Sequence, residues 1–116
     1  MEILSNNHKQ IIIDLNKITD NKISVGGSLE DYLLLGKADK PIGDIDFIVD
    51  DNEIFEKIKN HFDLPESKPS YYSRLCDFES RNKYTLVING VTVDFLVNTG
   101  DSVVCGELTE TVYDNI

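Results

Sequence analysis

A chain of 116 residues, 41% of them hydrophobic, has the size and composition of a single globular domain spanning residues 1–116, and this excludes disorder as its main state. Its formal net charge of −10 disfavours general binding to nucleic acids, because the surface repels phosphate backbones. With only Cys76 and Cys105, and with no signal peptide or long apolar span, the sequence predicts a cytoplasmic protein with reduced thiols and no membrane segment.

The first quarter of the chain predicts a helix followed by a short strand. In the segment from about residue 6 to 18, isoleucine and leucine recur at helical spacing, at Ile11, Ile12, Leu15 and Ile18. The apolar run Ile23–Val25 then predicts the first strand of a sheet.

A Gly-Gly-Ser turn at residues 26–28 follows this strand. Gly26 and Gly27 lack Cβ atoms, so their backbone can approach a ligand closely. Ser28 begins a helical pattern that Gly36 ends, and the free N–H groups at the start of that helix would attract an anion such as phosphate. Ser28 and Asp31 also have the spacing of a capping box, in which case Ser28 does no more than cap the helix.

The next strand is predicted at 44–49 and carries two aspartates separated by one residue. Because alternate side chains of a strand share a face, Asp44 and Asp46 project together while Ile45 and Phe47 project to the other side. Two neighbouring carboxylates repel each other unless a cation lies between them. Beside a helix N-terminus, such a pair is typical of a site for Mg²⁺ and a polyphosphate.

The segments on either side of this strand are a loop and a helix. The loop at 38–43 is flanked by Lys37 and contains Lys40, and these lysines either face solvent or reach a phosphate. Asp51 or Asn52 is the predicted N-cap of a helix that continues to residue 62. Its apolar stripe comprises Ile54, Phe55, Ile58 and Phe62.

From residue 63 to 81 the pattern weakens, and Pro65 and Pro69 predict a loop. The aromatic and basic side chains of this stretch either stack on a base and pair with phosphate or fill an edge of the core; they are Tyr71, Tyr72, Arg74, Phe78 and Arg81. The second alternative is the commoner one for a loop of this kind.

Asn89-Gly90 lies between two β-branched runs and predicts a two-residue β-hairpin with positive φ at both turn positions. This register pairs Thr85 with Asp94. Asp94 is a carboxylate inside an apolar strand, where burial without a partner would be costly, so it is expected to face solvent or a cation. Beyond residue 100 we expect an edge strand around 102–105 and a polar tail, without an assigned function.

The Gly-Gly-Ser turn, the short helix and the Asp-x-Asp strand together resemble the signature of the nucleotidyltransferase superfamily that includes DNA polymerase beta. The local likeness is to the head domain of bacterial poly(A) polymerases and CCA-adding tRNA nucleotidyltransferases, whose motif reads Gly-Gly-x-Val-Arg-Asp, Leu-Leu-Gly and Asp-apolar-Asp-Phe. The matching residues are Gly26, Gly27, Asp31, Leu34, Leu35, Gly36, Asp44, Asp46 and Phe47. Glu30 stands where the family has arginine, which reverses the charge beside the expected phosphate site.

The resemblance implies an α/β fold with a small mixed sheet, helices packed on one face and carboxylates exposed on the other. It implies transfer of a nucleotidyl group from an NTP, such as ATP, to a hydroxyl group. Asp44 and Asp46 would bridge two Mg²⁺ or Mn²⁺ ions about 3.5–4 Å apart, and Asp94 would be the third carboxylate. Gly26, Gly27 and Ser28 would bind the phosphates. The charge favours a protein or small-molecule acceptor over nucleic acid.

The alternative hypothesis is a catalytically silent nucleotidyltransferase-like module that binds a partner or senses a nucleotide. Minimal domains of this type resemble the antitoxin members of the superfamily, which modify a partner protein. Glu30 and the shortness of the chain favour this alternative, whereas the three carboxylates at 44, 46 and 94 favour an enzyme. A purely structural domain would leave those carboxylates without a purpose.

Overall fold

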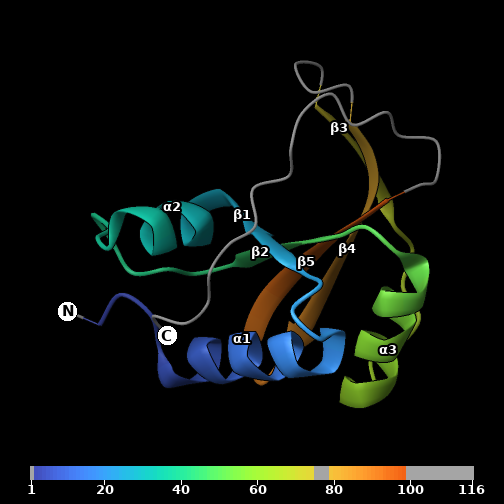
Figure 1. Cartoon of the computed structure of the whole chain (residues 1–116), viewed down its shortest axis with the longest axis horizontal. Helices are drawn as coiled ribbons and strands as arrows, with labels where there is room; N and C mark the ends of the chain where they lie inside the picture. The colour runs from blue at the N-terminus through green and yellow to red at the C-terminus, as the bar shows by residue number, and fades with distance from the viewer. Residues whose placement is uncertain (1, 75–78, 99–116) are drawn as a thin grey trace.

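The computed structural model describes residues 2–74 and 79–98, in which three helices pack against a five-stranded sheet (Figure 1). The elements are α1 (Asn6–Thr19), β1 (Ser24–Gly26), α2 (Gly27–Leu35), β2 (Ile45–Val49), α3 (Asn52–Phe62), β3 (Ser70–Arg74), β4 (Glu79–Ile88) and β5 (Val91–Asn98). The strand order is β1-β2-β5-β4-β3. β2 and β5 are parallel and the other neighbours are antiparallel, so the predicted small mixed sheet is confirmed.

The ends of the helices follow from local side-chain chemistry. Ser5 caps α1 by accepting a hydrogen bond from the backbone N–H of His8, and Asp51 caps α3 as the sequence predicts. α2 is different, because its N-cap is Gly26, which makes no side-chain bond. Ser28 therefore lies inside the helix, and the capping role considered for it is wrong.

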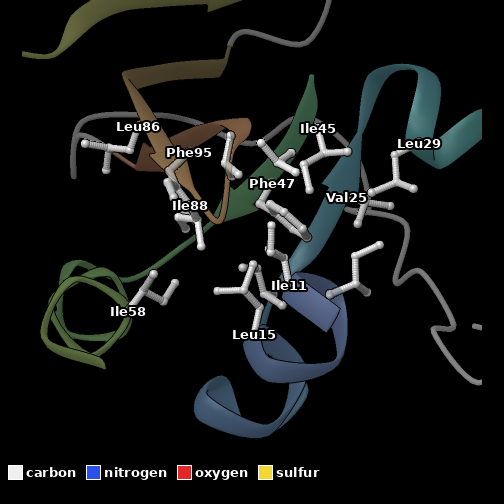
Figure 2. Packing of buried hydrophobic residues seen from close by; sticks show 14 of the residues in the cluster. Ile11, Leu15, Val25, Leu29, Ile45, Phe47, Ile58, Leu86, Ile88 and Phe95 are labelled. Carbon is white, nitrogen blue, oxygen red and sulfur yellow. The ribbon is translucent and has the colours of Figure 1, made fainter. Parts of the chain in front are cut away.

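The core lies under one face of the sheet. Alternate residues of β2 and β5 point into it and are almost fully buried; they are Ile45, Phe47, Val49, Val93, Phe95 and Val97. α1 and α3 cover this face, and Figure 2 shows Ile11, Leu15 and Ile58 pointing toward the sheet. Burying each large apolar side chain stabilises the fold by about 1.5–3 kcal/mol. This packing fixes which way the alternate, polar side chains of the same strands must face.

The loop predicted from 63 to 81 is correct only in its first part. β3 begins at residue 70 and pairs antiparallel with β4, which begins at 79. A weak local pattern is overridden here by pairing with a neighbouring strand, which supplies the backbone hydrogen bonds. The side chains of Tyr71, Tyr72 and Arg74 and the whole of Phe78 lie outside the described parts, so their proposed stacking role stays a prediction.

Arg81 belongs to the core edge. Its side chain is 1% exposed and donates to the carbonyl oxygens of Val49 at 3.2 Å and Leu96 at 3.5 Å. It also pairs with the carboxylate of Asp50 at 2.9 Å. Arg81 thus holds the ends of β2 and β5 together rather than facing a ligand.

The edge strand predicted around 102–105, the polar tail and Cys76 also lie outside the described residues. Within residues 2–74 and 79–98, no helix is both long and apolar enough to cross a membrane.

Candidate functional site

A row of polar positions crosses four neighbouring strands on the face opposite the core. The register places Gly26 beside Asp46, Asp46 beside Asp94, and Asp94 beside Thr85. The pairing of Thr85 with Asp94 is the one that the Asn89-Gly90 turn predicts. The two aspartates therefore lie side by side on parallel strands, although they are 48 positions apart in the sequence.

The carboxyl group of Asp46 is perturbed by burial and by its neighbour Asp94 on β5. Burial, a hydrogen bond to the Asp94 carboxyl and the charge of Asp94 raise the pKa of Asp46 from 3.8 to about 6, while the Lys83 ammonium group partly offsets this. A hydrogen bond between two carboxyl groups requires that one of them carry the proton. Above about pH 6 the Asp46 carboxyl group is therefore ionised beside Asp94, and a cation would stabilise this arrangement.

Asp94 is buried, with 8% of its surface exposed. Its Oδ1 accepts a hydrogen bond of 2.5 Å from the Thr85 hydroxyl, and Lys83 Nζ lies 3.8 Å from its Oδ2. A solvent-facing Asp94 is therefore wrong, and the cation beside it in the structure is the Lys83 ammonium group. Lys83 was not among the predicted site residues. The hairpin register was the signal available, because Lys83 and Thr85 lie two residues apart on one face of β4.

The two carboxylates open into a hollow of about 890 Å³. One wall comes from α2, through Ser28, Asp31, Tyr32 and Leu35, and another from the connecting loop, residues 37–44. Asp44 is exposed at the end of this loop, just before β2 begins. The structure thus places Asp44, Asp46 and Asp94 on the lining of one hollow, with Asp44 at its rim.

Gly27 brings the N-terminus of α2 directly against Asp46. Its φ is +59°, and a Cβ at this position would lie 2.6 Å from Asp46 Oδ2. Any other residue would therefore be strained and would also crowd the carboxylate. Because Gly26 caps α2 without a side chain, the first N–H groups of the helix have no side-chain cap, and Ser28 is exposed on the wall of the hollow. A phosphate bound here would lie beside the acidic pair.

The charges around this helix differ from the family-based expectation. Glu30 is half-buried and is not part of the wall of the hollow, whereas Asp31 is. The charge reversal at residue 30 therefore lies outside the lining of the hollow. Lys37 and Lys40 both line the hollow and are exposed, so both alternatives for these lysines, facing solvent or reaching a phosphate, stay open.

The carboxylates of the site are suitable ligands for Mg²⁺, but only two of the three aspartates are placed to hold it together. Carboxylate oxygens are the ligands this ion prefers, and Asp46 and Asp94 form a charged pair next to space that a Cβ at Gly27 would fill. However, within the described parts of the chain no three Asp, Glu, His or Cys side chains form a group ready to hold an ion. The pair fits a cation, whereas a site made by all three aspartates would require Asp44 to turn inward from the rim.

No protein-family model and no curated protein matches this chain. Among solved structures, it is similar to the crystal structure of TM1012 from Thermotoga maritima, a protein provisionally described as a nucleotidyltransferase. The two share 22% sequence identity, with a TM-score of 0.50 over 76% of this chain. The match covers 56% of the Thermotoga chain, so this chain spans little more than half of that protein's length.

This similarity and the sheet topology together define the class of the fold. The chain has the minimal nucleotidyltransferase fold, a mixed sheet with three helices in its described part. This similarity is one of fold alone, and the resemblance to the head domains of poly(A) polymerases stays a prediction.

Proposed function

We propose that the hollow binds an NTP with Mg²⁺ and that the protein transfers the nucleotidyl group to a hydroxyl acceptor. One observation carries this proposal, namely the contact between Gly27 and Asp46. It joins an uncapped helix N-terminus, which suits phosphate, to the Asp46–Asp94 pair, which suits a cation. The motif likeness to poly(A) polymerase heads covers these same residues and supports the same assignment.

Each part of the site has a role in this proposal. Asp46 and Asp94 would hold Mg²⁺ or Mn²⁺, with Asp44 joining from the rim, and the cation when bound would neutralise phosphate charge. Backbone N–H groups at Gly27 and Ser28 would bind the β- and γ-phosphates. The acceptor oxygen bonds to the α-phosphorus, the bond from that phosphorus to the αβ-bridging oxygen breaks, and pyrophosphate leaves. The hydroxyl proton passes to a carboxylate oxygen of Asp46, whose pKa, raised to about 6, suits it to accept a proton near neutral pH.

The acceptor is proposed to be a protein or a small molecule. A net charge of −10 repels nucleic acid at long range, and the hollow itself carries exposed Asp31 and Asp39 on its walls. A partner protein that binds beside the hollow would be both the acceptor and a subunit of the same complex, in the manner of the antitoxin-like members of the superfamily.

The test is a transfer assay with NTPs labelled at the α- or the γ-phosphate, in Mg²⁺ with cell lysate or a panel of hydroxyl compounds. We expect α-label to reach an acceptor and γ-label to be released as pyrophosphate. Asp46→Asn should abolish transfer. Transfer of γ-label would indicate a kinase instead, and a wild-type protein that moves no label from any of the four NTPs would contradict the proposal.

The second candidate is a silent module that binds a nucleotide without transferring it. It is favoured by one observation, the lack of a ready three-ligand metal group among the described residues. Nucleotide binding without transfer in the same assay would select this candidate.

A further inference from the structure

We infer that His8 is a positioning residue for this site. By holding the residue before Asp44, His8 limits where the Asp44 carboxylate can lie relative to the hollow. The role of His8 in the reaction rests on the proposed function, whereas the hydrogen bond that positions the loop does not. His8 lies in the first turn of α1 with 9% of its surface exposed. Its Nε2 lies 2.7 Å from the carbonyl oxygen of Gly43, which is 35 residues away and directly precedes Asp44.

The hydrogen-bond partners of the His8 ring set its orientation. A carbonyl oxygen can only accept, so Nε2 carries the proton and donates to Gly43. Nδ1 faces the Ser5 hydroxyl, which can donate to it when the ring is neutral. Ser5 Oγ in turn accepts from the His8 backbone N–H at 3.2 Å as the cap of α1. Both ring nitrogens are therefore engaged, and the orientation of the ring is set by the helix cap.

A second bond fixes the neighbouring peptide. The N–H of Ile42 donates to the carbonyl oxygen of Ile3 at 2.8 Å, and the Ile42 side chain is buried in the core. Residues 3–8 therefore hold 42 and 43, the last two positions before Asp44, through two separate hydrogen bonds. All of residues 42–44 line the hollow.

The sheet does not supply this restraint itself. β2 begins at Ile45, its pairing with β5 begins at the same residue, and its pairing with β1 ends at Asp46. Asp44 thus lies outside both ladders of backbone hydrogen bonds. Since a site with three aspartates needs Asp44 to reach the Asp46–Asp94 pair, the position of Gly43 limits where that carboxylate can go. The hydrogen bond from His8 to Gly43 would thus position the Asp44 carboxylate although His8 itself does not contact the ligand.

The test compares three variants. His8→Phe keeps a buried ring of similar size but leaves the Gly43 carbonyl without its donor. His8→Gln restores an amide N–H that can reach the same carbonyl. His61→Phe is the matched control, because His61 is exposed on α3 and far from the loop in sequence.

The first readout is amide hydrogen exchange without nucleotide. We expect exchange at 42–45 to become about tenfold faster in His8→Phe, since one buried hydrogen bond is lost, with β5 unchanged. His8→Gln should recover much of the protection, and His61→Phe should match the wild type. Unchanged exchange at 42–45 in His8→Phe, or equal acceleration in 42–45 and β5, would overturn the inference, the latter because it indicates a merely structural role.

The second readout is the affinity for Mg²⁺–NTP. We expect His8→Phe to weaken it about tenfold and His8→Gln to recover it. Equal affinity in all three variants and the wild type would refute the role toward Asp44. If the wild type binds no NTP, the proposed function fails, while the exchange data still decide whether His8 fixes residues 42–45.

Discussion

Asp46 is expected to reduce the stability of the metal-free protein at neutral pH, because it is partly buried beside a second carboxylate. Its pKa is raised from 3.8 to about 6 in the folded state. The unfolded chain therefore releases this proton near pH 4, whereas the folded chain keeps it to about pH 6. The free energy of unfolding should fall as pH rises between these values, and the full penalty is present above about pH 6.

Asp46→Asn should remove this dependence. Because Asp46 is only partly buried, solvent screening reduces the effect, and we expect the variant to be about 1 kcal/mol more stable than wild type at pH 7.5. At pH 3.5 the two should be nearly equal. Urea unfolding at both pH values measures the difference, with Asp39→Asn on the exposed loop as the control. An equal gain at both pH values would refute the electrostatic explanation.

Gly27 and Gly36 form a natural matched pair, since both have positive φ, of +59° and +74°. Alanine at either position should cost about 1 kcal/mol of stability in urea unfolding, because that backbone conformation is strained for a residue with a Cβ. Only at Gly27 does the new Cβ meet Asp46 Oδ2, whereas the space around Gly36 is open. We therefore expect Gly27→Ala alone to displace Asp46 and weaken Mg²⁺–NTP binding. Equal binding losses in the two variants would contradict the role given to Gly27.

At the scale of elements, α2 carries two neighbouring acidic residues, of which one lines the hollow and the other does not. Asp31 lines the hollow and Glu30 does not, so Asp31→Arg should raise the affinity for Mg²⁺–ATP several-fold and Glu30→Arg should change it little. Each substitution should alter stability by no more than about 1 kcal/mol. Calorimetric titration of both variants measures this, and a larger gain from Glu30→Arg would contradict the placement of α2.

Local chemistry made several elements predictable from the sequence alone. The Asn89-Gly90 turn specified the hairpin, and with it the position of Asp94 beside Thr85. Asp51 and Gly36 specified helix ends, because a cap acts only on its own turn of backbone. Asp46 could be assigned to the polar face because its neighbours in the strand are apolar and alternate with it.

The remaining features depend on contacts between distant residues, which leave no local pattern. Asp46 and Asp94 are neighbours only because β2 pairs in parallel with β5. The Asn89-Gly90 turn predicts the pairing of β5 with β4 but not its pairing with β2. The His8 contact with Gly43 links a helix to a loop 35 residues further on. The sequence could not decide whether Arg81 fills a core edge or binds a ligand, because its burial depends on carbonyl groups of two other strands. Tertiary structure decides each of these.

At the scale of the whole molecule, a divalent cation should stabilise the fold, because it relieves the repulsion of the acidic pair. At a concentration about ten times its Kd, Mn²⁺ or Mg²⁺ should raise Tm by about 5 °C at pH 7.5. Asp46→Asn should lose most of this increment, which thermal unfolding measures. A wild-type Tm that does not respond to millimolar Mn²⁺ would favour the silent module.

The central claim is that Asp46, Asp94 and the N-terminus of α2 together bind an NTP with a divalent cation. Calorimetric titration of the wild type and Asp46→Asn with each of the four NTPs, in Mg²⁺ and then in EDTA, tests it most directly. We predict that at least one NTP binds the wild type in Mg²⁺, and that EDTA or Asp46→Asn weakens this binding at least about tenfold. Failure of all four NTPs to bind, or binding that is equal in EDTA and in the variant, would contradict the claim.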